Sequence, residues 1–412
     1  MFIGNYNTYD IYGGAAKAAY RIHHSLLENS LRSTMYVNSA SSGDWTVNYP
    51  TGNLNRFLPK LRHATGALLT KSLKTGNPVL HSAAILNSGW VQRINSSSID
   101  VCHLHWINHE MMSIEDISKI RKPLVWTLHD MWAFCGAEHY SEDFRWRDGY
   151  NSKNRPFHEG GFDLNKWVWK RKKNAWKKPF HIVAPSNWLA DCVRQSELMK
   201  GWTVSVVNNP IDTEVWHPVE KNYARSLMRL PIDVPILLFG ALGGTTDSRK
   251  GFDLLFNALK HLQGHVNGLE IVVFGQLAPK NVMDLGFPIH YVGHLHDDLS
   301  LKILYSSADV MVVPSRQEAF GQTASEAHAC GTPVVAFGAC GLLDIVRHRI
   351  TGYLAKPFDS VSLAEGIFWV LSDRERHANL RTAARLQALE RFSYPVISDQ
   401  YKKVYKSAIG SI

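Results

Sequence analysis

Cysteine is scarce in this chain of 412 residues, which contains only five. They lie at Cys102, Cys135, Cys192, Cys330 and Cys340. Such scattered positions form neither a disulfide framework nor a paired Cys-x-x-Cys metal motif. Because disulfide bonds are rare in reducing compartments, we expect the protein in the cytoplasm.

Long apolar runs are also missing from the sequence. No stretch approaches the roughly 20 apolar residues of a membrane-spanning helix. The N-terminal segment, MFIGNYNTYDIYGG, lacks the basic start and the apolar run of a secretory signal, so we expect neither a spanning segment nor a signal peptide. The chain is nevertheless 45% hydrophobic, and this content of core-forming residues argues against a disordered protein.

Two kinds of site motif are absent as well. Gly13 and Gly14 follow the first predicted strand, but they are not part of a Gly-x-Gly-x-x-Gly fingerprint, which weakens a nicotinamide-binding interpretation. A tight glycine turn at this place could still admit a phosphate or a sugar. The chain has no His-Glu-x-x-His motif, and its 20 histidines do not gather at metal-ligand spacing. We therefore predict no metal site and no bound cofactor.

The net charge of +9 is distributed unevenly along the chain. Residues 1–205 contain 25 Lys and Arg against 16 Asp and Glu, whereas residues 206–412 contain 20 of each kind. A basic half is typical of proteins with an anionic partner, such as a membrane surface, a nucleic acid or an acidic substrate. A solvated basic face without any partner explains the excess equally well.

Short strand-like runs alternate with helical patterns, and the alternation occurs twice. A stretch rich in Asn and Pro, beginning VVNNPIDTEVWHP, separates the two series. We predict an α/β protein with two doubly wound, Rossmann-like domains, at residues 1–205 and 206–390, facing a central cleft. A long polar and aromatic insertion interrupts the first domain near residues 135–180. Residues 391–412 are expected to form a terminal helix that crosses back to the first domain.

The stretch PSRQEAFGQTASEAHACGTPVV, which starts at Pro314, carries two carboxylates around a glycine. Glu318 ends a predicted strand, and Glu326 lies about a turn and a half into the helix that follows Gly321. The N–H groups of a helix N-terminus suit a phosphate, and a glycine lets the backbone approach it closely. Glu326 would then reach a hydroxyl of the adjoining sugar. The alternative is a pair of solvated surface acids.

Two other places could carry chemistry. Arg249 and Lys250 precede a helix, and two adjacent cations could neutralise a diphosphate without a metal. An ordinary basic loop is the alternative there. His129 and Asp130 end another predicted strand, where the ligand-binding residues of such sheets lie. Chain spacing leaves open whether His129 faces a ligand or only supports the structure.

The segment EAFGQTASEAHACGTPVVAF closely resembles the Glu-x7-Glu segment of the retaining glycosyltransferases of family 4, which have the GT-B fold. Eight further segments resemble parts of that family in the same order, from GGAAKAAYRI to RFSYPVISDQYKKVY. The ordered set is far more specific than the motif alone. The nearest subgroup resembles bacterial enzymes that build capsular, exopolysaccharide or lipopolysaccharide chains.

The resemblance implies a role for each candidate residue. Arg249 and Lys250 would hold the donor diphosphate, and His129 would lie beside the transferred sugar. Glu318 would contact hydroxyls of that sugar, and Glu326 would contact the nucleotide ribose. Six further residues would line the phosphates and the sugar: Gly13, Gly14, Phe320, Gly321, Gln322 and Thr323.

The implied function is transfer of a hexose from a UDP- or GDP-sugar to a saccharide or lipid-linked saccharide. The resemblance also implies retention of the anomeric configuration and a role in surface polysaccharide synthesis. Two other classes remain open. A nucleotide-sugar epimerase of the same shape would rearrange the donor without an acceptor, and a non-catalytic binder of polyanions or sugars would leave it unchanged. We expect no nucleic-acid partner.

Residues 165–180, NKWVWKRKKNAWKKPF, contain seven basic residues, no acids and three tryptophans. On a helix, Trp169 and Trp176 share a face, and indole rings among cations suit the surface of an anionic membrane. A peripheral location at the inner face of the cytoplasmic membrane would follow. A core-packed helix with a solvated basic face is the alternative.

Relatives often carry several cysteines in the insertion near residues 135–180, but here only Cys135 remains. No metal site is therefore expected in the insertion, and a role in binding the acceptor stays open.

Overall fold

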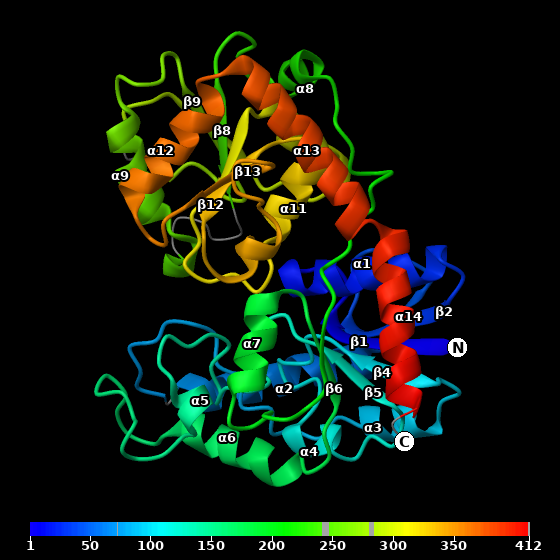
Figure 1. Cartoon of the computed structure of the whole chain (residues 1–412). Coiled ribbons are helices and arrows are strands. Elements are labelled where there is room, and N and C mark those ends of the chain that lie inside the picture. The colour runs from blue at the N-terminus through cyan, green and yellow to red at the C-terminus, as the bar shows by residue number, and fades with distance from the viewer. Residues whose placement is uncertain (72, 241–246, 280–283, 411–412) are drawn as a thin grey trace. The chain divides into compact units, whose positions relative to one another are not determined.

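The computed structural model describes residues 1–71, 73–240, 247–279 and 284–410 (Figure 1). The chain forms two compact units. Unit 1 comprises Met1–Asn208 together with the chain from Ile397 onward, and unit 2 comprises Asn209–Val396. This division lies three residues from the boundary predicted at 205/206, and the C-terminal helix belongs to unit 1.

Unit 1 contains a parallel sheet of seven strands in the order β3-β2-β1-β4-β5-β6-β7. The strands are β1 (Phe2–Tyr9), β2 (Arg32–Ser39), β3 (Val47–Asn48), β4 (Val101–Leu104), β5 (Leu124–Thr127), β6 (His181–Ala184) and β7 (Val204–Val206). The helices are α1 (Gly14–Glu28), α2 (Asn53–Lys71), α3 (Trp90–Ser96), α4 (Ile114–Ile117), α5 (Arg145–Asp148), α6 (Leu164–Ala175) and α7 (Asn187–Gln195), with α14 (Tyr394–Gly410) returning from unit 2.

The C-terminal helix α14 is part of the core of unit 1. Its residues Ile397, Tyr401 and Tyr405 pack with buried side chains of α1, β1, β4, β5 and β6. The hydroxyl of Tyr401 lies 3.0 Å from Thr127 Oγ1, and that of Tyr405 lies 2.8 Å from His103 Nδ1. A buried hydroxyl needs a partner, so these bonds fix the register of α14 on the sheet.

Unit 2 contains a parallel sheet of six strands in the order β10-β9-β8-β11-β12-β13. The strands are β8 (Ile236–Gly240), β9 (Glu270–Phe274), β10 (Ile289–Gly293), β11 (Val310–Val313), β12 (Val334–Phe337) and β13 (Gly352–Ala355). The helices are α8 (Lys221–Met228), α9 (Phe252–Leu262), α10 (Asp298–Ser307), α11 (Gln322–Ala329), α12 (Ser360–Leu371) and α13 (Arg374–Phe392), with 3₁₀ turns η1 (Ser248–Lys250) and η2 (Cys340–Asp344).

Both faces of the unit 2 sheet are covered, because its strands alternate between two apolar cores. Leu237 packs in one core and Leu238 in the other, and Val310 and Met311 divide in the same way. Side chains of a strand point alternately to opposite faces, so a strand buried on both sides is apolar throughout. The prediction of an α/β protein with two doubly wound parallel sheets is confirmed.

Each sheet has one point at which the strand order reverses. In unit 2 this point lies between β8 and β11, and in unit 1 between β1 and β4. Ligands of doubly wound sheets bind beyond the carboxyl ends of the strands at such points. The segments that follow β8, β11, β1 and β4 are therefore the places to examine.

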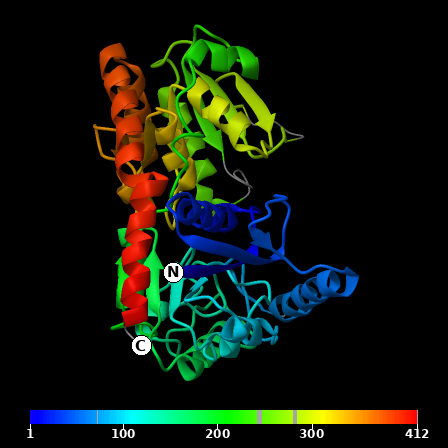
Figure 2. The same cartoon turned by 90° about the vertical axis from the view of Figure 1, so that its right-hand side faces the viewer.

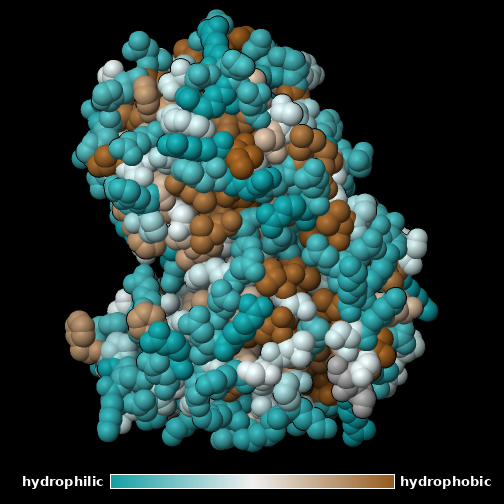
Figure 3. All heavy atoms as spheres, in the orientation of Figure 1, coloured by the Kyte–Doolittle hydropathy of each residue, from teal (hydrophilic) through white to brown (hydrophobic). Residues whose placement is uncertain are grey.

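In the described part of the chain, no helix is long and apolar enough to cross a membrane. The face visible in Figure 3 is mainly hydrophilic, with apolar residues scattered among polar ones.

Candidate functional site

Lys250 and Glu318 meet at the switch point of unit 2. Lys250 ends the turn η1 after β8, and Glu318 lies in the loop between β11 and α11. Lys250 Nζ donates to Glu318 Oε1 over 2.5 Å, and both side chains are largely buried. Ser315 Oγ donates to the same oxygen over 3.1 Å. Among the described residues Glu318 is the hydrogen-bond partner of Lys250 Nζ, so two N–H donors of this ammonium remain for a ligand.

The two loops that carry this pair are tied together by backbone contacts. Arg316 N–H donates to the carbonyl of Arg249 over 2.7 Å, and the Arg316 guanidinium donates to the carbonyl of Ser248 over 2.9 Å. Gly251 has φ 66°, and a Cβ there would lie 1.9 Å from the carbonyl oxygen of Pro314. Only glycine allows this approach, so Lys250 is held at a fixed place beside the end of β11.

Arg249 is paired with Asp247, a residue that the sequence analysis missed. The guanidinium donates to the two carboxylate oxygens over 3.1 Å and 2.6 Å. Burial alone would raise the pKa of Asp247, but the hydrogen bonds and the charge of Arg249 outweigh it, and the pKa is lowered. Both predicted cations therefore have carboxylate partners. The ion pairs fix the positions of both charges, and whether the loop binds a diphosphate stays a prediction.

Gly321 turns the chain from the β11 loop into α11. It has φ 108°, a value that favours glycine, and a Cβ there would lie 2.7 Å from Leu342. The side chain of Phe320 is buried, with its ring 5.6 Å from that of Phe392. The predicted contribution of Phe320 is therefore restricted to its backbone. The first turn of α11, with Gln322 and Thr323, presents helix N-terminal N–H groups next to Glu318 in the chain.

Glu326 lies inside α11 and is only 6% exposed. Its Oε2 accepts a hydrogen bond of 3.0 Å from the hydroxyl of Tyr305 on α10. The side chain of Glu318 is 16% exposed. The alternative interpretation of both glutamates as solvated surface acids is therefore wrong. Tyr305 was not predicted, and nothing in its spacing from Glu326 could have indicated the contact.

Gly13 and Gly14 lie at the switch point of unit 1, at the start of α1. Gly13 has φ 84° with no atom within 4 Å of an added Cβ, so the backbone angle rather than space requires glycine. Asp10 accepts hydrogen bonds from the N–H groups of Ile11, Ser41 and Ser42. Burial would raise the pKa of Asp10, but these bonds lower it overall, and they order the loop before Gly13.

His129 follows β5, and its neighbours determine which ring nitrogen carries the proton. Asn5 Nδ2 donates to Ser33 Oγ over 2.8 Å, so Asn5 Oδ1 accepts from His105 Nε2 over 3.1 Å. Burial keeps the pKa of His105 well below its ordinary value, so its Nδ1 is an acceptor. His129 Nε2 lies 3.3 Å from that atom and must donate.

A neutral His129 with a lone pair on Nδ1 follows from these contacts. Burial lowers the pKa of His129 to about 4, although the charge of Asp130 opposes the shift. The ring can therefore accept a hydrogen bond near neutral pH. Asp130 itself bonds to other groups, namely His139 over 2.6 Å and the Trp106 indole over 2.9 Å.

Aromatic and polar side chains line a cavity of about 410 Å³ in unit 1. The lining includes Tyr9, Asn38, Tyr49, Lys60, His63 and His109. The rings of His63 and His109 stack with centroids 4.0 Å apart, and His109 Nδ1 lies 3.0 Å from the Tyr9 hydroxyl. His109 has φ 55° and Glu110 has φ 58°, left-handed values that are uncommon outside glycine and tend to occur at functional sites.

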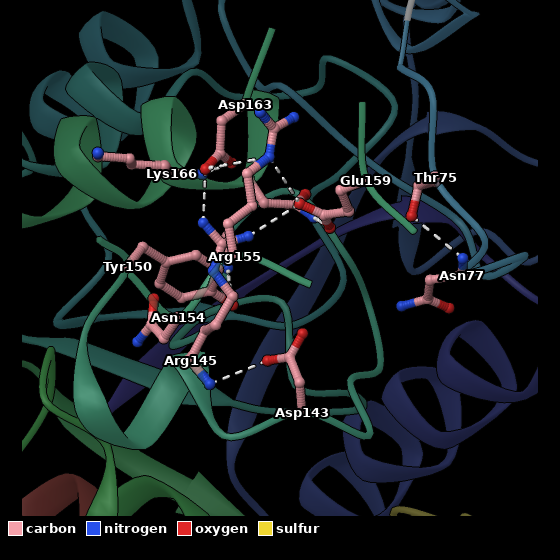
Figure 4. Close-up of polar contacts among 12 residues, drawn as sticks. Thr75, Asn77, Asp143, Arg145, Tyr150, Asn154, Arg155, Glu159, Asp163 and Lys166 are labelled. Atoms are coloured by element: carbon pink, nitrogen blue, oxygen red, sulfur yellow. Dashed lines mark hydrogen bonds and ion pairs between the residues drawn. The ribbon is translucent and has the colours of Figure 1, made fainter. Parts of the chain in front are cut away.

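The insertion near 135–180 is organised around buried charges (Figure 4). The Arg145 guanidinium, 1% exposed, donates to Glu159 over 2.9 Å and to Asp163 over 2.6 Å. Arg155 Nε lies 3.6 Å from Glu159 and 3.7 Å from Asp163. Two arginines and two carboxylates thus form a charged cluster beside the buried apolar side chains of this segment, such as Trp146 and Val168. Within the described ranges, no three His, Cys, Asp or Glu side chains gather as a metal would require.

Two of the three tryptophans of residues 165–180 are not at the surface, whereas Trp167 is 38% exposed. Trp169 and Trp176 are 5% and 4% exposed, and the Trp176 indole donates to the carbonyl of Ile114. Lys172 is fully buried, and Arg171 pairs with Glu115 over 2.6 Å. The prediction that these two indoles face lipid is wrong, because α6 packs them into unit 1.

Two family models match the chain and together cover most of it. Residues 12–215 match the model described as Glycosyltransferase Family 4, and residues 242–387 match that described as Glycosyl transferases group 1. The chain belongs to glycosyltransferase family 4. The predicted family and the GT-B type of the fold are confirmed.

Among curated members of this family, a D-inositol 3-phosphate glycosyltransferase of Xylanimonas cellulosilytica is 33% identical over 221 residues, which are 50% of this chain and 51% of the relative. An uncharacterized glycosyltransferase of Methanocaldococcus jannaschii is 33% identical over 195 residues, 46% of this chain and 48% of the relative. The chain thus spans about half the length of the curated relatives it matches.

Solved structures with the same fold cover the whole chain. Sucrose-phosphate synthase from Thermosynechococcus elongatus superposes with a TM-score of 0.66 at 18% identity, covering 100% of this chain and 99% of that one. HepE from Anabaena, solved with UDP-glucose, superposes with a TM-score of 0.67 at 17% identity. The superposition covers 99% of this chain and 100% of HepE.

Proposed function

We propose that this family 4 protein transfers a hexose from a UDP- or GDP-sugar to a saccharide or lipid-linked saccharide, with retention of configuration. The observation that carries the proposal is the Lys250–Glu318 pair at the unit 2 switch point, beside the N-terminal turn of α11. Anabaena HepE, which shares the fold, was solved with UDP-glucose and supports a nucleotide-sugar donor. Synthesis of a surface polysaccharide at the cytoplasmic side of the membrane is the proposed setting.

In the proposed reaction the anomeric C–O bond breaks, and negative charge grows on the leaving diphosphate. The two remaining N–H donors of Lys250 and the first turn of α11 would stabilise this charge. The ion pair with Glu318 orients Lys250 before a donor arrives. The lysine therefore needs little rearrangement in the transition state. Glu318 would contact sugar hydroxyls, Arg249 the diphosphate and Glu326 the ribose.

From unit 1 we assign His129, Gly13 and Gly14 to the same reaction. The neutral His129 presents an Nδ1 lone pair that can accept from a sugar hydroxyl. For the acceptor we favour the 410 Å³ cavity, because aromatic rings stack on the apolar faces of sugar rings and Asn38 supplies directional polar contacts.

The experiment that tests the proposal is a thermal-shift screen of nucleotides and nucleotide sugars, followed by analysis of the products. A transferase should release the nucleoside diphosphate and form a new glycoside when an acceptor is present. An epimerase would convert the donor to another nucleotide sugar without an acceptor. Binding of donors with no turnover under any condition would favour a non-catalytic sugar-binding protein and contradict the proposal.

Transfer should persist in excess EDTA. Arg249, Lys250 and the helix N-terminus can together neutralise a diphosphate, a task that a divalent cation performs in other transferases. The rate of nucleoside diphosphate release, measured with and without EDTA, should be the same within error. Activity that is lost with EDTA and restored by Mg²⁺ or Mn²⁺ would show that this prediction is wrong.

Glu326→Ala should weaken binding of the nucleoside diphosphate about tenfold to hundredfold, because a hydrogen bond to a charged group contributes about 1.5–3 kcal/mol. Calorimetric titration of the nucleotide measures the change. Tyr305→Phe is the matched control, since it removes one hydrogen bond to Glu326 from within the protein and keeps the carboxylate. Equal losses in both variants would mean that the buried bond between them, rather than a ribose contact, accounts for the effect.

A further inference from the structure

Helix α2 turns its apolar side chains away from unit 1. Phe57, Leu61 and Leu68 are 57%, 50% and 67% exposed, and Ala64 between them is exposed as well. Their spacing of i, i+4, i+7 and i+11 places all four on one face of the helix. A helix that was merely seated on a protein core would show the opposite arrangement, with this stripe buried. We refer to these four residues as the outer stripe.

The inner face of α2 is held by close packing and polar contacts. Gly66 is buried, and a Cβ there would lie 2.7 Å from Glu110 Cγ. Glu110 in turn accepts hydrogen bonds of 2.7 Å and 2.8 Å from the backbone N–H groups of Ile85 and Leu86. The Arg62 guanidinium donates to the carbonyl of Leu86 over 2.6 Å. The outer stripe therefore takes no part in attaching α2 to its unit.

The charge of α2 restricts what can cover the outer stripe. The sequence of residues 53–71, NLNRFLPKLRHATGALLTK, contains four basic residues and no acid. Lys60 and Lys71 are exposed, and on a helical wheel they border the stripe. Figure 2 shows α2, in light blue, projecting from the rest of unit 1. A covering surface must accordingly be apolar and negatively charged.

We propose that α2 lies on the surface of an anionic lipid bilayer, with the outer stripe among the acyl chains and Lys60 and Lys71 at the lipid phosphates. Interfacial helices combine such an apolar face with cations that meet anionic headgroups. A second copy of the chain fits less well, because two apposed α2 helices would bring Lys60 and Lys71 together with no acid on either helix. This contact replaces α6 as the membrane-binding element and does not depend on sugar transfer.

The test is flotation of the full-length protein with vesicles of phosphatidylcholine alone or mixed equally with phosphatidylglycerol. Binding should require the anionic lipid and should fall as salt rises. Phe57→Gln, Leu61→Gln and Leu68→Gln together should lower the partition coefficient by at least about tenfold. The matched control is Leu227→Gln, Phe368→Gln and Leu386→Gln, three similarly exposed residues on helices of unit 2. It should bind like the wild type.

The charged residues are tested in the same assay. Lys60→Gln and Lys71→Gln should each weaken binding about fivefold, the factor expected for one cation near an anionic surface. Lys170→Gln and Lys178→Gln, exposed on and after α6, remove the same charge and should leave binding unchanged. If the α2 variants and the α6 variants lost vesicle binding equally, only the net charge would attract the protein to the membrane. This outcome would overturn the assignment to α2.

Two further outcomes would also overturn the proposal. One is unchanged binding of the triple α2 variant. The other is a molar mass of the triple variant that differs from that of the wild type, measured by light scattering without vesicles. The outer stripe would then bind a second copy of the chain. Hydrolysis of a soluble nucleotide sugar by the triple variant, at the wild-type rate, shows that the fold is intact. If neither protein hydrolyses any donor, the proposed function fails while the vesicle result still decides the membrane contact.

Discussion

Lys250→Ala should lower kcat by about 10²- to 10³-fold while changing KM for the donor much less. This is the loss seen when one preorganised donor to a developing negative charge is removed, about 2.7–4 kcal/mol in the transition state. Lys250 is oriented by its 2.5 Å contact with Glu318 and by the close approach of Gly251 to Pro314. Steady-state kinetics with a nucleotide-sugar donor measure the effect.

The matched control for this variant is Lys260→Ala on α9. Lys260 is exposed and lies over the ring of Phe256 on the same helix, so its removal changes the net charge equally and should leave kcat unchanged. The double variant Lys250→Ala/Glu318→Gln should lose less than the product of the single losses, because the two side chains act as a pair. A rise in KM without a fall in kcat would mean that Lys250 only binds the donor.

Lys172→Met should destabilise unit 1 by about 3–5 kcal/mol, because each buried acceptor left without a donor costs about 1–3 kcal/mol. The ammonium is fully buried and donates to three carbonyl oxygens, those of Trp132, Cys135 and Gly136. Methionine fills similar space but leaves these acceptors without a donor. The hydrogen bond from Tyr150 and, to a smaller extent, Lys172 oppose the burial-driven rise in the pKa of Glu138, and the substitution removes the second of these influences.

Urea unfolding followed by tryptophan fluorescence measures this loss, because 11 of the 13 tryptophans lie within residues 1–208. The control is Lys170→Met, an exposed neighbour on the same helix, which should change stability by less than about 0.5 kcal/mol. If both variants unfolded at the same urea concentration, the three-carbonyl contact would contribute nothing to unit 1.

The arrangement of strands and helices could largely be read from the sequence. The strand predicted before Glu318, which is β11, is buried on both faces and is therefore apolar without interruption. Short elements were missed. β3, with two residues, and β13, which begins at a glycine, carry too little pattern to be recognised. Helix α2 was also missed, since Pro59 interrupts its helical pattern.

The candidate site, too, could be predicted only in part from the sequence. The positions of Glu318, Gly321 and Glu326 follow from local signals, because a glycine turn between strand and helix is a property of consecutive residues. The partners of these residues do not. Lys250 meets Glu318 across 68 residues of chain, and Tyr305 meets Glu326 across 21, through contacts that only the packed sheet creates.

By itself the sequence determined the α/β class, the family and the glycine turn at the Glu-x7-Glu motif, because each depends on the order and periodicity of neighbouring residues. Only the tertiary structure decided which apolar and basic faces are covered. α6 and α2 are both basic, amphipathic helices in sequence, yet Trp169 and Lys172 of α6 are buried while Phe57 and Leu68 of α2 are exposed. Periodicity shows that a helix has an apolar face, but whether that face meets protein or solvent depends on neighbours that lie far away along the chain.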